Sequence, residues 1–194
     1  MNKNIEHYVF HKENFLDEKY CENCINESNK CDWQKHEWYN SVSDFSQGRS
    51  GDNELEILSE SVFSYNIEKI NDFIIQNLHS TILEYVESLK FDWFGDWTGY
   101  SAIRFNRYFP GQTMLNHCDH IQSLFDGERK GIPVLSIIGI LNDDYEGGEL
   151  IMFEDKKIDT KKGDLLIFPS NFLYPHEITP VTKGVRYSYV SWMW

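Results

Sequence analysis

The chain has 194 residues, of which 41% are hydrophobic and 15% aromatic, and its formal net charge is −13. This length and composition predict one folded domain, residues 1–194, with a core of its own. The acidic balance argues against nucleic acid and anionic membranes as partners, because both attract basic surfaces. Neither a secretory signal nor a run of about 20 apolar residues is visible. We therefore expect a cytoplasmic protein, of a cell or a virus-infected host cell, that is not secreted; the oligomeric state is not indicated.

The N-terminal part, residues 1–98, is predicted to be a helix-rich region that supports the rest of the domain. Asp17 is placed as the N-cap of a short helix from Glu18 to about Asn26. Apolar residues recur at three- and four-residue intervals between Glu54 and Lys90, which predicts an amphipathic helix. A shorter helix around Leu55–Val62 is expected to precede it. We expect the long helix to pack along one face of a sheet.

Residues 21–36, which begin inside the first expected helix, raise the question of a zinc site. Cys21, Cys24, Cys31 and His36 have a spacing near that of structural zinc sites. Cys21 and Cys24 also share one face of the expected helix, where a free thiol behaves as a small apolar group. We favour buried thiols and keep zinc as the alternative. The polar segment at 40–52 is expected to be a loop.

From Gly99 onward the apolar pattern changes to short runs bounded by Gly, Pro, Asn and Asp. This pattern predicts antiparallel strands, and strands in this number favour a double-sheet jelly roll over residues 99–194. The expected strands are 101–108, 113–119, 133–141, 148–153, 164–168, 174–179 and 185–193.

Four residues of this half form a pattern with chemical meaning. His117 and Asp119 are separated by one residue, and His176 and then Arg186 follow later in the chain. In an extended segment His117 and Asp119 would point to the same side and could hold one ion. Two imidazoles and one carboxylate are the ligand set of non-heme Fe(II) oxygenases, which leaves coordination positions open. A fixed Arg could then bind the carboxylate of a co-substrate bidentately.

Five ordered blocks, over roughly residues 100–194, resemble the Fe(II)- and 2-oxoglutarate-dependent oxygenases, and within them the prolyl 4-hydroxylase-like group. Met114 departs from the pattern, since many relatives carry Tyr there, and Arg186 stands where collagen-type enzymes usually have Lys. Gly147 and Gly148 fit a tight turn that needs positive φ. The blocks are Tyr108-x-x-Gly111-Gln112-x-Met114-x-x-His117-x-Asp119, Leu141-Asn142 through Gly147-Gly148-Glu149-Leu150, Gly163-Asp164 through Phe168, His176, and Arg186 with Trp192.

The resemblance implies a mostly β fold with flanking α-helices. Its core would be a double-stranded β-helix (jelly roll), with the metal between the two sheets at one mouth and the N-terminal helical or mixed region packed on one sheet. The implied Fe(II) ligands are His117, Asp119 and His176. Arg186 is implied as the anchor for the distal carboxylate of 2-oxoglutarate.

Further residues are placed near this site. Tyr108 resembles the family Tyr that donates to the same carboxylate. Asn106 and Arg104 share its face of the strand, so either could reach the pocket. Ser188 shares the face of the implied arginine anchor and could add a hydroxyl contact. Trp192 resembles a Trp near the substrate channel, although ordinary packing is its simpler interpretation.

The implied activity is hydroxylation of an unactivated C–H bond with Fe(II), 2-oxoglutarate and O2, releasing succinate and CO2, with ascorbate as a reductant. Proline in a peptide or protein is the leading substrate, and a free amino acid or other small metabolite is the alternative. Nucleobase oxidation ranks third because of the acidic charge. Two non-enzymatic interpretations stay open: a cupin-like metal-binding or sensing protein, and a zinc-stabilised interaction module.

Overall fold

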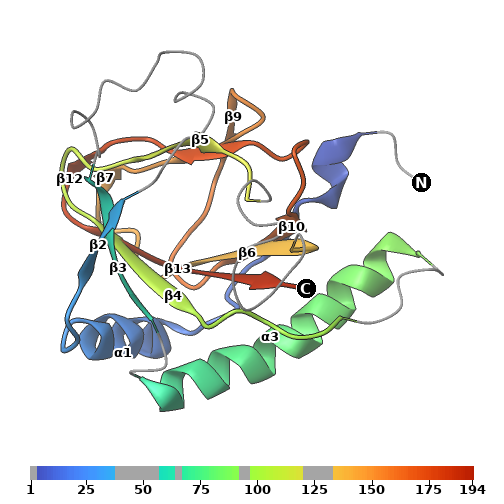
Figure 1. Cartoon of the computed structure of the whole chain (residues 1–194), viewed down its shortest axis with the longest axis horizontal. Helices are drawn as coiled ribbons and strands as arrows, with labels where there is room; N and C mark the ends of the chain where they lie inside the picture. Colours follow the sequence, from blue (N-terminus) through green and yellow to red (C-terminus); the bar gives the residue numbers. More distant parts are fainter. Residues whose placement is uncertain (1–3, 38–56, 64–66, 92–96, 120–132) are drawn as a thin grey trace.

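The computed structural model describes residues 4–37, 57–63, 67–91, 97–119 and 133–194. These residues form a mostly β structure with antiparallel sheets and two α-helices. Figure 1 shows three layers: the helices lie below a large central sheet, and a smaller sheet covers its other side. The mostly β jelly-roll fold expected from the sequence is confirmed.

The chain opens with a 3-10 helix, η1 (Ile5–Tyr8), followed by a short strand, β1 (Phe10–Lys12), and the helix α1 (Glu18–Ser28). The Asp17 side chain accepts a hydrogen bond of 2.7 Å from the backbone N–H of Tyr20. This bond satisfies an amide that has no partner inside the helix. The predicted cap and helix are therefore confirmed.

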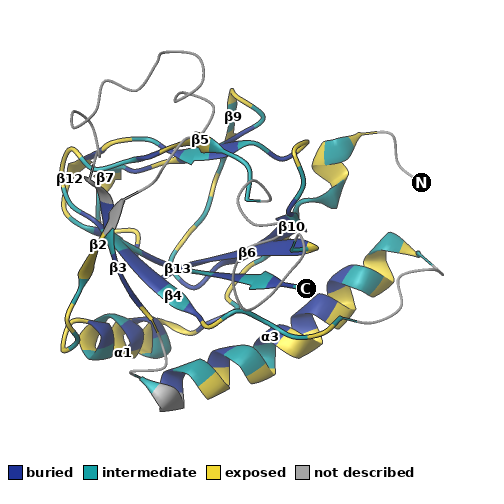
Figure 2. Cartoon of the chain, viewed as in Figure 1, coloured by how far each residue is buried: buried dark blue, intermediate teal, exposed yellow. Residues whose placement is uncertain are grey.

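The long helix α3 (Glu68–Leu89) buries one face against the central sheet. Its buried positions follow a spacing of four residues, from Ile70 through Ile74 and Leu78 to Ile82, which places them on one stripe. In Figure 2 the buried, dark blue parts of α3 lie on the side of the helix that faces the sheet. None of the described helices has an apolar stretch long enough to cross a membrane.

The prediction of a short helix around Leu55–Val62 is wrong. Its described part is a strand, β3 (Ile57–Phe63), which pairs with β2 (Gln34–Glu37) on one side and with β4 (Arg104–Tyr108) on the other. Pairing on both sides satisfies its backbone amides and carbonyls, and this outweighs the weak helical spacing of the segment. The expected loop at 40–52 lies outside the described residues.

The central sheet has seven antiparallel strands in the order β1-β10-β6-β13-β4-β3-β2. A four-stranded sheet, β5-β11-β8-β9, lies over its inner face, and β12 pairs with β7. Every strand expected from the sequence is present, while β7, β9 and β12 were not expected. The remaining bounds are β5 Met114–His117, β6 Leu135–Ile140, β7 Glu146–Gly147, β8 Leu150–Met152, β9 Lys156–Ile158, β10 Leu165–Pro169, β11 His176–Ile178, β12 Val181–Lys183 and β13 Arg186–Met193.

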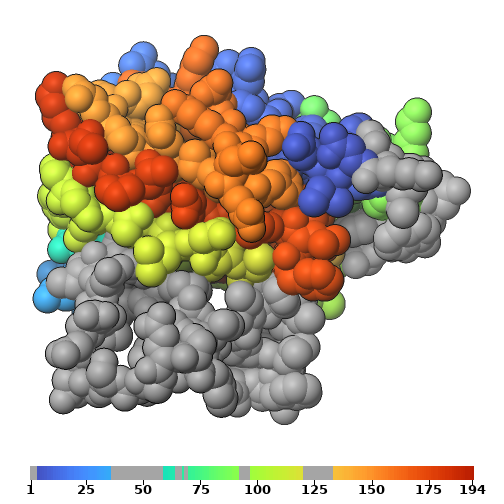
Figure 3. Space-filling view, turned by 90° about the horizontal axis from the view of Figure 1, so that it is seen from above, coloured from blue at the N-terminus to red at the C-terminus, as the bar shows by residue number. Residues whose placement is uncertain are grey.

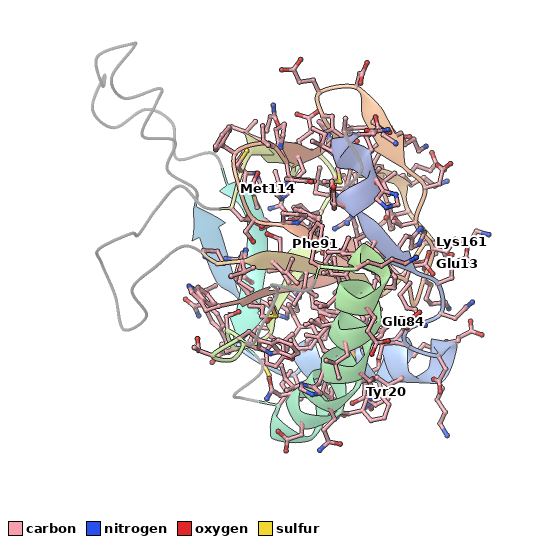
Figure 4. All side chains as sticks on the ribbon, turned by 90° about the vertical axis from the view of Figure 1, so that its right-hand side faces the viewer. Glu13, Tyr20, Glu84, Phe91, Met114 and Lys161 are labelled. Carbon is pink, nitrogen blue, oxygen red and sulfur yellow. The ribbon has the colours of Figure 1, made fainter. Side chains whose placement is uncertain are left out.

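Two apolar clusters lie on opposite faces of the central sheet. One fills the space between the sheet and the helices, and Tyr20 of α1, labelled in Figure 4, packs against it. The Tyr20 ring also stacks on the more exposed Phe73 of α3, with 4.1 Å between ring centroids. Here Gly139 lies under the Tyr189 ring, and a Cβ at this glycine would come within 1.9 Å of that ring. The other cluster lies between the two sheets and includes Met114.

The cysteines of the N-terminal part pack as apolar side chains. Cys21 and Cys24 are fully buried in the cluster between the helices and the sheet. Burial raises the pKa of both thiols, that of Cys21 to about 11, so each stays protonated at neutral pH. Cys31 donates to the carbonyl of Glu27. The potential metal-binding cluster found in the described part of the chain contains no cysteine, and the His36 side chain lies outside that part.

Two leucines of α3 provide a matched test of this packing. Leu78 is 0% exposed and Leu83 is 42% exposed on the same helix. We expect Leu78→Ala to lower the free energy of unfolding by about 2–5 kcal/mol, because it removes buried methyl groups and leaves a cavity. Leu83→Ala should change it by less than about 0.5 kcal/mol. Urea unfolding followed by circular dichroism measures both, and equal losses would contradict the packing described.

Candidate metal and co-substrate site

Pairing between β5 and β11 brings two histidines together from distant parts of the chain. His176 lies directly opposite His117 in the register of the two strands. Their ring centroids are 4.4 Å apart, at an angle of 50° between the ring planes. The four-stranded sheet therefore presents two imidazoles side by side at one end of the space between the sheets.

Backbone carbonyls fix which nitrogen of each ring faces the site. The Nδ1 atom of His117 lies 2.8 Å from the carbonyl oxygen of Leu115, and that of His176 lies 3.1 Å from the carbonyl oxygen of Tyr174. A carbonyl oxygen can only accept a hydrogen bond, so each Nδ1 carries the proton when the ring is neutral. Each Nε2 then has a free lone pair, which is the form that binds a metal.

Asp119 completes the cluster from the turn after β5. We had expected a strand to continue through residue 119, but β5 ends at His117. The carboxylate still reaches the same point, because Oδ1 lies 3.4 Å from Nε2 of His117 and 3.8 Å from Nε2 of His176. Atoms of the three side chains lie within 4.8 Å of one another. His120, the next residue along the chain, lies outside the described residues.

The surroundings favour the charge states that a metal requires. Burial by itself raises the pKa of the Asp119 carboxyl, but electrostatic attraction to His176 and His117 and a hydrogen bond from Ser136 more than offset it, so the pKa lies well below its usual range. Burial lowers the pKa of the His176 imidazole. An ionised carboxylate and a neutral imidazole result. Ser136 is itself held by Ser170, with 2.6 Å between their hydroxyl oxygens.

Arg186 is buried in the same space on the inner face of the central sheet. The residue is 2% exposed, and its Nη1 donates a 2.8 Å hydrogen bond to the Ser188 hydroxyl. Its Nε has no hydrogen-bond partner, and no carboxylate of the described residues lies within 4.0 Å of the guanidinium. A buried cation without an anion is costly. A bound carboxylate would compensate the charge of this guanidinium.

Two neighbours shape this anchor. The guanidinium carbon of Arg186 lies 5.3 Å from the ring centroid of Tyr108, directly across the β4–β13 pair. Burial raises the pKa of the Tyr108 hydroxyl, so this group is a hydrogen-bond donor at neutral pH. Gly148 has φ +61°, and a Cβ there would approach the arginine Cδ to 3.0 Å. The expected positive φ at Gly147 and Gly148 is confirmed, and the second glycine also leaves space for the arginine.

Trp192 lies half-buried on the same strand as the arginine anchor, with the guanidinium carbon of Arg104 5.1 Å from its ring centroid. Arg104 therefore reaches the inner face, as its position in β4 predicted. Ser136 was not identified from the sequence. It is the polar member of the apolar run 134–141, and that interruption of an otherwise apolar strand was the available signal.

This geometry agrees with a comparison of the sequence with known families. Residues 103–194 match the sequence model of the 2OG-Fe(II) oxygenase superfamily. The match begins within one residue of β4 and includes the histidine pair, Asp119 and Arg186. The superfamily implies Fe(II), 2-oxoglutarate and O2.

The similar curated proteins include PKHD-type hydroxylases. A PKHD-type hydroxylase of Stenotrophomonas maltophilia is 34% identical over 99 residues, which are 48% of this chain and 43% of that protein. Another, from Shewanella oneidensis, is 38% identical over 94 residues, which are 46% of this chain and 41% of that protein. The chain spans about two fifths of the length of these relatives.

Solved structures share the fold over nearly the whole chain. The viral collagen prolyl hydroxylase vCPH of Paramecium bursaria Chlorella virus-1, in its 2OG complex, superposes with a TM-score of 0.65 at 19% identity, covering 96% of this chain and 94% of that one. A prolyl hydroxylase of Trichoplax adhaerens, in complex with a peptide fragment, gives a TM-score of 0.64 at 20% identity, covering 96% and 83%. These likenesses show a prolyl 4-hydroxylase-like fold.

The cluster predicts metal binding that can be measured without any turnover. We expect the protein to bind one Mn(II) or Fe(II) ion per chain, and His176→Ala to weaken binding by more than about 100-fold, because changes outside the coordination shell already cost 10–100-fold. Calorimetric titration without O2 measures this affinity. His7→Ala is the matched control, since His7 is exposed on η1. Equal affinity of the wild type and His176→Ala would exclude the cluster as the metal site.

Proposed function

We propose that this chain is an Fe(II)- and 2-oxoglutarate-dependent dioxygenase that hydroxylates an unactivated C–H bond. The observation that carries the proposal is the placement of Arg186. A buried guanidinium without a carboxylate partner among the described residues faces the same space as the cluster of His117, Asp119 and His176. A co-substrate with a metal-chelating end and a distal carboxylate satisfies both features, and 2-oxoglutarate has both.

The donor set of the cluster fits Fe(II). Two neutral imidazoles and one ionised carboxylate form the facial triad of non-heme Fe(II) oxygenases. In this chain the ligand atoms would be Nε2 of His117, Nε2 of His176 and Oδ1 of Asp119. Iron, with 2-oxoglutarate bound, supplies the activation of O2 and the oxidative decarboxylation that yield succinate, CO2 and the hydroxylated product.

The protein's own side chains bind and orient the co-substrate. Arg186 would donate two N–H groups to its distal carboxylate, the geometry that a guanidinium fork favours. Ser188 holds the guanidinium in place through its 2.8 Å bond with Nη1. Tyr108, protonated and buried beside the arginine, would donate to the same carboxylate.

Apolar residues of the inner face keep water away from the reaction. Ile138 and Ile140 follow Ser136 on the same face of β6, and Leu166 and Phe168 lie beside them on β10. All of these apolar side chains are buried between the two sheets. Exclusion of water limits unproductive oxidation of the protein itself when no substrate is bound.

We propose proline in a peptide or protein as the substrate. Support comes from the relatives, which are named PKHD-type hydroxylases, and from the fold shared with prolyl hydroxylases, one of them solved with a peptide. Trp192, half-buried beside Arg104, is the aromatic surface of this chain that we assign to the substrate side. A free amino acid or another small metabolite is the competing substrate class.

Succinate formation tests the proposal. Protein, Fe(II), ascorbate and 2-oxoglutarate are incubated with and without a proline-rich peptide, and the peptide is weighed by mass spectrometry. We expect the peptide to stimulate succinate formation and to gain the mass of one oxygen atom. His117→Ala should abolish both, because it removes a metal ligand.

The oxygenase activity and the prolyl substrate are rejected by different results. Succinate that depends on His117, together with an unmodified peptide, would keep the oxygenase and reject prolyl hydroxylation. Equal succinate from the wild type and His117→Ala would reject the oxygenase.

A further inference from the structure

The inner face of β4 carries a buried amide that the proposed roles do not use. Asn106 is 2% exposed, and its Oδ1 atom has no hydrogen-bond partner. Buried amide groups without partners are rare in folded proteins and cost free energy, so each calls for an explanation. A group that becomes satisfied only when a ligand binds is one such explanation.

The register of the sheet places this amide beside the carboxylate anchor. Asn106 lies directly opposite Ser188, whose hydroxyl accepts the bond from Nη1 of Arg186. The next residue pair along the same two strands is Arg186 opposite Tyr108. The side chains of these four residues share one face, because they are two residues apart on paired strands.

Two unpartnered polar atoms therefore lie on adjacent strands of the same buried surface: Oδ1 of Asn106 and Nε of Arg186. A half turn of the amide exchanges its oxygen with its NH2 group, so the side chain can present two N–H donors at the position that now lacks a partner. A carboxylate accepts such donors through several lone pairs. One bound acid can satisfy the arginine and the amide together.

We propose that Asn106 is a further binding residue for the acidic co-substrate, donating an amide N–H to an oxygen of 2-oxoglutarate beside Arg186. This inference rests on the proposed function, and it assigns a role that the ligand cluster and the arginine do not cover. The amide adds a neutral donor to the site without adding a second charge. It therefore favours an acid that extends along β4 over a small inorganic anion held by Arg186 alone.

Calorimetry with Mn(II)-loaded protein tests this assignment, because Mn(II) occupies the metal site without O2 chemistry. We expect Asn106→Ala to raise the dissociation constant of 2-oxoglutarate about tenfold, the effect of losing one hydrogen bond to a charged group. Asn106→Asp keeps the size of the side chain and turns an acceptor toward Arg186, so it should weaken binding further. The affinity for Mn(II) should stay the same in both variants.

Ser191→Ala is the matched control for removing a buried polar group from the central sheet. Ser191 is fully buried on β13, but it lies on the opposite face from Ser188. Its replacement should leave the affinity for 2-oxoglutarate unchanged.

Three outcomes would overturn the assignment. Wild-type affinity for 2-oxoglutarate in Asn106→Ala would show that the amide does not touch the acid. Equal losses of Mn(II) and 2-oxoglutarate affinity, or unfolding of both variants, would show a packing role. Failure of the wild-type protein with Mn(II) to bind 2-oxoglutarate would reject the proposed function and this inference with it, whereas the first two outcomes leave the proposed function intact.

Discussion

The central constraint on this structure is one buried positive charge. Arg186 lies between the two sheets, where desolvation of a guanidinium costs several kcal/mol without an anion to compensate. One serine hydroxyl takes one of its donors, and Nε stays without a partner. Burying this group lowers the free energy of unfolding of the ligand-free protein. A bound carboxylate would offset that loss by pairing with the guanidinium.

Strand register connects this charge to the metal cluster. The β4–β13 pair aligns Tyr108 with Arg186 and Asn106 with Ser188, which collects the polar groups on the inner face of the large sheet. The β5–β11 pair aligns His117 with His176 on the small sheet. Because the sheets face each other, the cluster and the arginine line one space. The helices contribute by burying the opposite face of the central sheet, where the apolar cluster makes that sheet rigid. Figure 3 shows that the side bearing the smaller sheet is formed mainly by the C-terminal half, coloured yellow-green to red, with η1 at one edge.

The C-terminal half could be predicted well because its signals are local and ordered. The strand boundaries follow Gly, Pro and Asn, and the histidines and Arg186 occupy a spacing that has chemical meaning. Asp119 was predicted to lie beside His117 because both would share one face of a strand. The carboxylate does lie beside His117, but it reaches this position from the turn after β5. The division at residue 98 stays a prediction, although β1 and β3 of the N-terminal part pair with strands of the C-terminal part.

Other features depend on tertiary contacts that a sequence does not display. β3 was expected as a helix, because its apolar spacing is ambiguous and pairing with β4 on one side and β2 on the other decides its state. Ser136 supports Asp119 only because folding brings its hydroxyl within hydrogen-bonding reach of the carboxylate. The sequence does not show that Oδ1 of Asn106 lacks a hydrogen-bond partner, because this depends on which side chains fold around it.

Thermal unfolding of wild-type protein and Arg186→Met, both with Mn(II) and each with and without 2-oxoglutarate, tests the central claim most directly. If the arginine is a buried charge that waits for an acid, Arg186→Met without 2-oxoglutarate is at least as stable as the wild type, because replacing an unpaired buried charge by an apolar side chain is neutral or stabilising. Added 2-oxoglutarate then raises the unfolding temperature of the wild type alone. A large loss of stability in Arg186→Met without the acid, or equal stabilisation of both proteins by the acid, would contradict the account.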